Sequence, residues 1–220
     1  MRRQSLFSSP VNAFVVLADV AIMTTFVLFL YLMAQSLLLN QEAFKVKALE
    51  KRQADLEQAY RQRLGEAIWN SKQVYVRSDL GVQHFYFSDN VLFDEGKYLL
   101  KPEAQAFLTP FAEIIAPRME ADQKITLIVE GHTDNIPYGI AGQDNWDLSA
   151  KRAIEVVRFL QNCRYPINPR RMAASGRGEY VSIAPNATSP SGKPAGNPRN
   201  RRIEIIVQYT GNQQAAQEIR

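Results

Sequence analysis

The longest apolar stretch of the chain lies near its beginning. From Val11 to Leu39 the only charged residue is Asp19. Because a hydrocarbon core of about 30 Å needs roughly 20 apolar residues in a helix, this stretch can span a bilayer with some tilt. A cleaved signal peptide is the alternative, since Arg2 and Arg3 precede the stretch. Signal peptides carry an apolar region of only about 7–15 residues, so the length and the acid favour a retained transmembrane helix over residues 11–39.

The segment that follows is helical in pattern. Between Asn40 and about Asn70, apolar residues recur at steps of three and four, with charged residues between them. The apolar residues are Val46, Leu49, Leu56, Tyr60, Leu64 and Ala67. This spacing predicts a membrane-proximal helical linker within residues 40–73. Its apolar stripe can pair with a second copy of the chain or lie against the chain's own domain. We favour pairing, although Gln53 and Arg63 interrupt the stripe.

Strand and helix patterns alternate from about Val74 onward. The predicted strands are Val82–Phe87, Ile125–Glu130, Arg171–Gly176 and Arg202–Val207. The predicted helices run from Pro102 to Pro117 and from Leu148 to Leu160, the second with Asp147 and Ser149 as candidate caps. Residues 185–198 are rich in Pro, Ser, Gly and Asn, which is typical of a surface loop. We therefore predict an α/β domain (an α+β sandwich) over residues 74–209, followed by a polar tail over 210–220.

Composition narrows the classes of function. The net charge is +4, and the basic residues are scattered rather than gathered in a patch with aromatics, so we expect no nucleic-acid partner. The single cysteine excludes an internal disulfide. His84 and His132 have no neighbours at metal-ligand spacing, so neither a metal site nor a cofactor is expected. No nucleophile–base pair stands out, and the chain is therefore not expected to be an enzyme.

Asp19 requires an explanation because of where it lies. A carboxylate in the apolar part of a membrane helix costs several kcal/mol unless it is paired, hydrated or protonated. Asp19 lies about 12 Å along the helix, which argues against a side chain that merely reaches the interface. Met23, Thr24, Phe26 and Leu30 continue the same side, which is suited to packing against partner helices. A single helix cannot enclose an ion path, so conduction would require another, polytopic subunit.

A second polar cluster follows the strand that ends at Glu130. Gly131 to Asn135 form the turn after this strand, and Asn145 and Arg152 belong to the next helix. Brought together, Asp134 would take an ammonium group and Arg152 a carboxylate through a bidentate fork. Diaminopimelate in a peptidoglycan stem peptide offers both groups. The residues alone leave open a buried Asp134–Arg152 salt bridge that only braces the fold.

Four ordered segments resemble OmpA-like peptidoglycan-binding domains. They are Val91–Asp94 with Leu100 and Pro102, Gly131–Asp134, Asn145 with Leu148, Ser149, Arg152 and Ala153, and Asn200–Glu204. The resemblance implies that Asp134 and Arg152 are peptidoglycan-binding residues, with Asn145 and Thr133 beside them. It favours the ligand site over the bare salt bridge.

The resemblance extends to MotB-type stator proteins. The run from Gly131 to Pro137 followed by Asn145–Ser149 is similar to their domain, and Ala18–Asp19 with Met23, Thr24 and Phe26–Leu30 resembles their membrane helix. In that family the aspartate carries the transported ion. The resemblance implies a homodimer that joins a pentameric MotA-like subunit in the bacterial inner membrane. The N-terminus, residues 1–10, would be cytoplasmic and the C-terminal domain periplasmic, holding the complex to peptidoglycan.

Some positions depart from the MotB pattern. Leu17 stands where an aromatic residue is expected, and Val20 follows Asp19. There is no separate plug segment unless residues 41–64 serve as one. These departures leave open a non-flagellar relative such as the subunit of the Zorya phage-defence systems. A passive OmpA-like or Pal-like wall anchor without ion transport is the alternative. Asp19 fits either a proton or a sodium ion.

Overall fold

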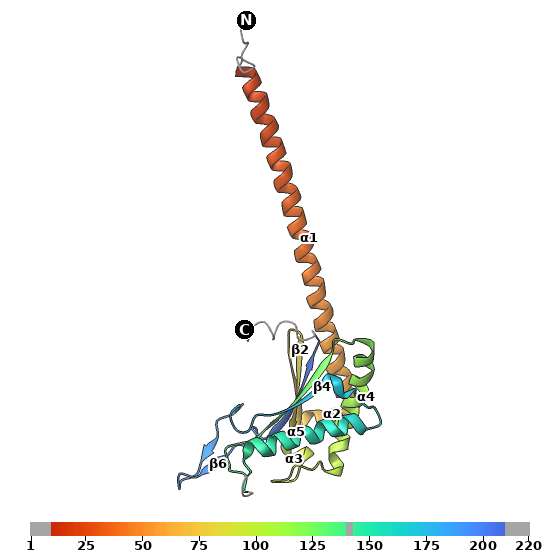
Figure 1. Ribbon diagram of the computed structural model, residues 1–220, viewed down its shortest axis with the longest axis vertical. Helices are drawn as coiled ribbons and strands as arrows, with labels where there is room; N and C mark the ends of the chain where they lie inside the picture. The colour runs from red at the N-terminus through yellow and green to blue at the C-terminus, as the bar shows by residue number, and fades with distance from the viewer. Residues whose placement is uncertain (1–9, 140–142, 210–220) are drawn as a thin grey trace. The chain divides into compact units, whose positions relative to one another are not determined.

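The computed structural model describes residues 10–139 and 143–209. The chain divides into two units between Ala48 and Leu49. Helix α1 begins at Pro10 and ends at Leu64, so it forms the described part of the first unit and enters the second (Figure 1). Within the described ranges, it is the one helix that is long and apolar enough to cross a membrane, by length and composition.

The break after α1 has a local cause. Gly65 has a φ of 80°, which most other residues adopt only at a cost, and it separates α1 from the short helix α2 (Glu66–Asn70). The linker predicted as one helix up to Asn70 is therefore two helices.

The second unit contains a five-stranded sheet with the strand order β1-β2-β7-β3-β4. Its strands are β1 (Val74–Asp79), β2 (Val82–Ser88), β3 (Thr126–His132), β4 (Met172–Gly176) and β7 (Arg202–Gln208). Only β3 and β4 pair in parallel, and the other neighbours are antiparallel. The four predicted strands are confirmed, whereas β1 was not singled out because its second half is exposed and polar.

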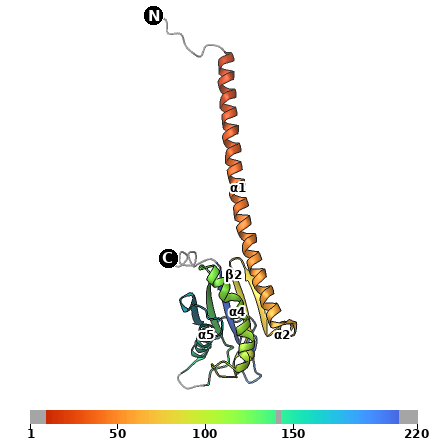
Figure 2. The same ribbon diagram turned by 90° about the vertical axis from the view of Figure 1, so that its right-hand side faces the viewer.

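Helices cover one face of this sheet (Figure 2). They are α4 (Gln105–Ala121), α5 (Asn145–Asn162) and the last turns of α1, and the shorter elements are α3 (Asp89–Leu92), η1 (Pro102–Ala104) and η2 (Pro169–Arg171). Alternate strand residues point into this layer, among them Phe85, Phe87, Leu127, Val129, Ile203 and Ile205, and all are buried. The predicted α/β sandwich is confirmed as two layers around one core.

Two predicted helix ends are corrected. Helix α4 continues past Pro117 to Ala121, since Met119 is buried in the core and holds the last turn in place. Helix α5 begins at Asn145 rather than Leu148, because Asp144 is its N-cap and forms a capping box with Asp147. Ser149 is not a cap: its hydroxyl donates to the carbonyl of Trp146 and accepts from the amide of Gly178.

The loop predicted over residues 185–198 contains a small hairpin. Its strands are β5 (Ala187–Thr188) and β6 (Pro194–Gly196), which pair with an irregular register. The tails predicted over 1–10 and 210–220 lie outside the described residues except for Pro10.

The apolar stripe on the last turns of α1 lies against its own domain. Leu56 and Tyr60 are fully buried, and the Tyr60 ring lies 5.6 Å from that of Phe85 and 6.0 Å from that of Phe111, between ring centroids. The Tyr60 hydroxyl donates to the carbonyl of Phe107 at 2.9 Å. Between Leu49 and Leu64 the stripe therefore belongs to the domain core, and our prediction of a dimer contact there is not supported.

Gln53, which interrupts the stripe in the sequence, has a specific role in this packing. Its amide nitrogen donates to the carbonyls of Asp79 and Val82 at 2.8 and 3.0 Å, and its own backbone carbonyl accepts from Gln83. These bonds join α1 to the turn between β1 and β2. A polar residue thus continues the packing surface, since its hydrogen-bonding groups are satisfied.

Candidate peptide-binding site

A cavity of about 450 Å³ lies where three chain segments meet at one end of the sheet. The segments are the end of β2 with α3, the turn after β3, and the first turns of α5. All four residues predicted from the sequence line or border this cavity: Thr133, Asp134, Asn145 and Arg152. Asp89 and Arg201 line it as well.

Two glycines allow α5 to lie directly on the sheet. A Cβ at Gly131 would lie 2.1 Å from the backbone oxygen of Ser149, and one at Gly176 would lie 2.6 Å from the amide nitrogen of Ala150. Neither distance is possible for a real side chain, so the helix would have to move. Gly131 therefore sets the distance between Asp134, which follows it, and Arg152 on the helix.

Arg152 is buried, with an exposed fraction of 2%. Its Nη1 lies 2.9 Å from Oδ1 of Asp89, and its Nε donates to the carbonyl of Lys97 at 2.8 Å. The guanidinium also lies over the ring of Phe93, 5.0 Å from its centroid. Burial lowers the pKa of Arg152, and the charge of Asp89 acts in the opposite direction. The guanidinium is therefore held in one orientation at the wall of the cavity.

Asp134 is paired with another arginine. Its Oδ2 accepts from Nη1 of Arg201 at 2.7 Å, and its Oδ1 accepts from the amide of Ile136 at 3.3 Å. Gly196 of β6 approaches the same carboxylate so closely that a Cβ there would lie 2.2 Å from Oδ2. Because Gly196 also has a φ of 70°, two features restrict this position to glycine.

The site is a row of alternating charges rather than a single pair. Arg152 contacts Asp89, the Nε of Arg201 lies 4.0 Å from Oδ2 of Asp89, and Arg201 contacts Asp134. Asp134 and Arg152 do not form the direct salt bridge that the sequence left open, since each has another partner. Burial raises the pKa of Asp89, while the charges of Arg152 and Arg201 partly offset that effect.

Sequence reasoning missed Asp89 and did not assign a role to Arg201. Arg201 belongs to the motif Asn200–Glu204, so its role was within reach of the family resemblance. Asp89 had no comparable signal because it stands in a polar junction between β2 and α3.

Asn145 and Thr133 have different surroundings. The side-chain amide of Asn145 donates to the carbonyls of Asp134 and Ile136 and to the Glu179 carboxylate, at 2.8–3.2 Å. Asn145 thus fixes the turn that carries Asp134 and is a positioning residue. The Thr133 hydroxyl is buried without a hydrogen-bond partner among the described residues.

Asp19 belongs to the other unit. Its side chain is exposed on α1, as are Met23, Phe26 and Leu30. The Thr24 hydroxyl donates to the carbonyl of Ala21 within the helix. Asp19 therefore lies on a helix whose apolar side chains are free to contact lipid or other helices.

Comparison with known proteins identifies the family. The model of the OmpA family matches residues 92–201, which is half of the chain, and the chain belongs to this family. Over 121 residues the chain is 31% identical to Motility protein B of Bacillus subtilis, covering 54% of this chain and 42% of that protein. It is 32% identical over 121 residues to Outer membrane porin F of Pseudomonas fluorescens, covering 54% and 32%. The chain thus spans less than half the length of these curated relatives.

Solved structures agree with the sequence comparison. A putative MotB-like protein from Desulfovibrio vulgaris matches with a TM-score of 0.59 and 25% identity, covering 74% of this chain and 98% of the other. The cell wall anchor of the type VI secretion system from Pseudomonas aeruginosa matches with a TM-score of 0.51 and 27% identity, covering 68% and 96%. The resemblance to MotB-type proteins with an OmpA-like domain is confirmed.

Proposed function

We propose that the OmpA-like domain binds the stem peptide of peptidoglycan in the cavity between Asp134 and Arg152. The observation that carries this proposal is the row Arg152–Asp89–Arg201–Asp134 at the wall of one cavity. Two buried acids and two arginines held at fixed positions complement a ligand that carries both an ammonium and a carboxylate group.

The roles of the residues follow from their surroundings. Arg152 and Arg201 supply donors for a ligand carboxylate, and Asp134 accepts from a ligand ammonium group. The Thr133 hydroxyl has no partner among the described residues, so it can bond to a ligand without breaking an internal contact. Family membership supports this assignment, since the cell wall anchor from Pseudomonas aeruginosa has the same fold.

Binding to purified peptidoglycan sacculi tests the proposal. We expect Asp134→Asn and Arg152→Lys to lower the affinity about tenfold or more, because each removes a charge-assisted or bidentate contact. Arg170→Gln is the matched control, since Arg170 is exposed on η2 and does not line the cavity. Circular dichroism verifies that each variant is folded. Undiminished binding by both cavity variants would show that the site is elsewhere.

We also infer that the whole protein is the stator subunit of an ion-driven motor in the bacterial inner membrane. In this proposal two copies of the chain form a homodimer that joins a pentameric, MotA-like polytopic partner, and Asp19 carries a proton or sodium ion. The N-terminus is cytoplasmic, and the OmpA-like domain anchors the complex in the periplasm. The isolated carboxylate in the apolar part of α1 and the identity with Motility protein B support this inference.

A passive wall anchor is the competing proposal, because it accounts for the OmpA-like domain without ion transport. The two proposals differ in their partner. A stator subunit co-purifies from membranes with a multi-helix protein, whereas a passive anchor requires none. A flagellar or a phage-defence motor, such as a Zorya system, is equally compatible with this partner.

A further inference from the structure

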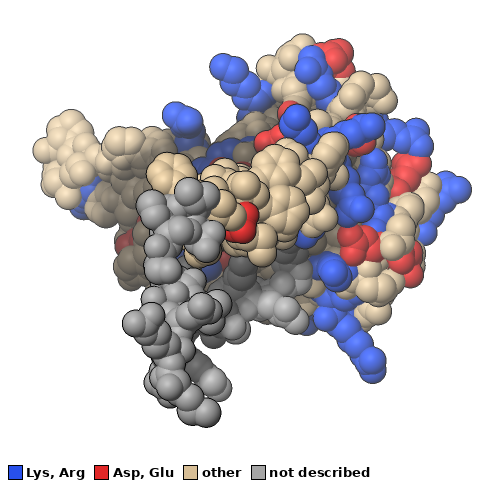
Figure 3. All heavy atoms as spheres, turned by 90° about the horizontal axis from the view of Figure 1, so that it is seen from above, with Lys and Arg blue, Asp and Glu red and all other residues tan. Residues whose placement is uncertain are grey.

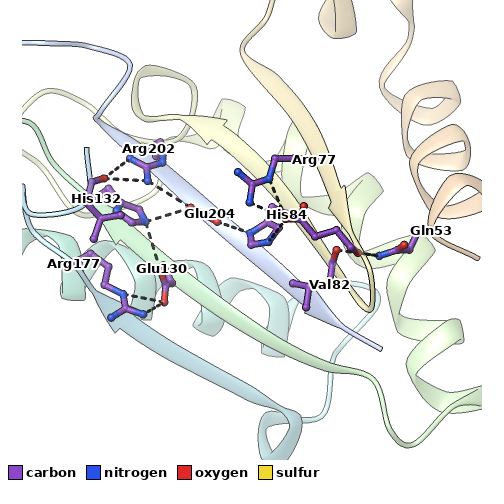
Figure 4. Close-up of polar contacts among 11 residues, drawn as sticks. Gln53, Arg77, Val82, His84, Glu130, His132, Arg177, Arg202 and Glu204 are labelled. Atoms are coloured by element: carbon purple, nitrogen blue, oxygen red, sulfur yellow. Dashed lines mark hydrogen bonds and ion pairs between the residues drawn. The ribbon is translucent and has the colours of Figure 1, made fainter. Parts of the chain in front are cut away.

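A second polar cluster lies on the face of the sheet opposite the helices. Glu130 and His132 are two residues apart on β3, and Glu204 is the direct register partner of Glu130 on β7. Side chains two residues apart in a strand point to the same face, which brings the three groups together. Figure 4 shows His132 directed toward both carboxylates. None of the three residues lines the peptide-binding cavity.

His132 has no hydrogen-bond partner in this cluster. Its exposed fraction is 1%, and neither ring nitrogen is bonded within the described part of the chain. Nε2 lies 3.5 Å from Oε2 of Glu204 and 3.7 Å from Oε2 of Glu130, which is longer than an ordinary hydrogen bond. Buried polar groups are rarely left unpaired, and a bound ion is one of the regular reasons when they are.

The spacing of the three groups suits a metal ion between them. The candidate ligand atoms all lie within 4.8 Å of one another. With bonds of about 2.0–2.2 Å, neighbouring ligands around a tetrahedral ion are separated by about 3.4 Å. The distances of 3.5 and 3.7 Å from Nε2 to the two carboxylate oxygens are close to that value.

The second oxygen of each carboxylate is held by another residue. Nε of Arg177 donates to Oε1 of Glu130 at 3.0 Å, and Nδ1 of His84 lies 2.6 Å from Oε1 of Glu204. Figure 4 shows these contacts on the outer sides of the cluster. The two Oε2 atoms are thereby directed inward to His132. Metal ligands are regularly oriented in this way by neighbouring donors.

One positive charge competes for the same space. Nη2 of Arg202 lies 3.6 Å from Oε2 of Glu204, but its guanidinium also donates to the carbonyl of Val181 at 3.2 and 3.3 Å. The contact with Val181 can therefore hold Arg202 while an ion takes the inner oxygen of Glu204. The carboxylates are each about 10% exposed, so the cluster is reached from solvent along their edges.

We propose that Glu130, His132 and Glu204 form a binding site for one divalent transition-metal ion, of the class represented by Zn²⁺. One imidazole nitrogen with two carboxylate oxygens favours Zn²⁺ and its first-row neighbours over Mg²⁺ and Ca²⁺, which prefer oxygen ligands alone. The fourth position is open to water. An ion here joins β3 to β7 at the centre of the sheet, so the metal has a structural role. The proposal is independent of the peptide site and of ion transport.

Titration of the untagged full chain in detergent, freed of metal with a chelator, tests the site. We expect one equivalent of Zn²⁺ to bind with a dissociation constant in the micromolar range or below, and Tm to rise by several degrees. Mg²⁺ at the same concentration is expected to have no such effect. Absence of saturable Zn²⁺ binding by the parent protein would overturn the proposal.

Variants assign the binding to these residues. Glu130→Gln and Glu204→Gln are each expected to weaken Zn²⁺ binding at least tenfold, whereas Glu120→Gln, an exposed acid on α4, leaves it unchanged. Equal binding by the parent and both variants would place the ion elsewhere and overturn the site.

If the variants do not fold, the NMR spectrum of the parent protein with bound Co²⁺ tests whether His132 is a ligand. The chain has two histidines, so His84→Gln in the metal-free state assigns the His132 ring signals, and the paramagnetic shifts of these signals in the parent with Co²⁺ report ligation directly. An unshifted His132 ring would contradict the proposal.

Discussion

At the residue scale, the candidate peptide site depends on how buried charges are paired. Asp89 was not recognised in the sequence, yet it contacts Arg152 and lies near Arg201. Asp134 and Arg152 line the same cavity without forming an ion pair with each other, because Asp89 and Arg201 are their partners. A ligand that binds there exchanges ion pairs already present in the domain. Such an exchange requires the arginines to stay fixed, and the bond from Arg152 to Lys97 serves that purpose.

The pH dependence of stability tests the burial of Asp89. Burial raises the pKa of Asp89 above its ordinary value of 3.8. At pH values between the ordinary and the raised pKa, the folded state therefore holds a proton on Asp89 that the unfolded state has released. Protonation of Asp89 therefore stabilises the folded state as pH falls from 7 toward 4. This stabilisation is lost as pH rises through the raised pKa. We expect Asp89→Asn to remove this part of the pH dependence in urea unfolding between pH 4 and 7.

Asp94 provides a control of opposite sign. The hydrogen bond from Lys97 lowers the pKa of this exposed carboxylate, so its contribution is present above the unfolded pKa and is lost as pH falls. Asp94→Asn is therefore expected to change the pH profile in the direction opposite to Asp89→Asn. If both substitutions changed the pH dependence of stability in the same direction, the argument from burial of Asp89 would be contradicted.

At the scale of elements, the last turns of α1 are part of the domain core. Leu56→Ala is expected to lower the free energy of unfolding by about 2–5 kcal/mol, because it leaves a cavity beneath the sheet. Gln58→Ala on the exposed side of the same turns is the control and is expected to change stability by less than about 0.5 kcal/mol. Urea unfolding of the full chain in detergent measures both. A small effect of Leu56→Ala would mean that this segment is free to pair with a second copy.

The contact between α5 and the sheet is a second property of elements. We expect Gly131→Ala to cost about 1–3 kcal/mol or more, since its Cβ would lie 2.1 Å from the backbone oxygen of Ser149. The helix would move with Arg152, so binding to sacculi should fall together with Tm. Gly139→Ala is the matched control for Tm alone, because no atom of the described residues lies within 4 Å of a Cβ there. Equal Tm values for the two variants would show that α5 accommodates the added atom.

At the scale of the whole molecule, the chain combines a helix suited to a membrane with a charged, water-exposed domain. Figure 3 shows Lys and Arg interspersed with Asp and Glu on the visible surface. On this face the two signs of charge are mixed, and the whole chain carries a net charge of +4.

Asp19→Asn tests the proposed stator function at this scale. The substitution keeps size and polarity but removes the carboxylate that would carry the ion, so motor output should be abolished. Membrane insertion and co-purification with the partner should be unchanged. Thr25→Val is the control for a polar position in the same helix, because the Thr25 hydroxyl donates to the carbonyls of Ala21 and Ile22 within that helix. Motor output retained in Asp19→Asn would exclude ion transport by this residue and favour the passive anchor.

The sequence by itself determined the features that depend on local patterns. The apolar stretch from Val11 to Leu39, four of the five strands of the sheet and the motif from Gly131 to Asp134 could all be recognised, because periodicity and turn chemistry act over a few residues. Helix ends were less predictable: α4 passes through Pro117 because its last turn packs on the core.

Tertiary structure decided which distant groups meet. Arg201 reaches Asp134 across 67 positions of sequence. Glu204 faces Glu130 only because β7 is inserted between β2 and β3. The same holds for the stripe on α1, whose spacing fits a dimer as well as a domain core. Its burial depends on Phe85 and Phe111, which lie on other elements, and periodicity alone carries no information about the surface that a helix will meet.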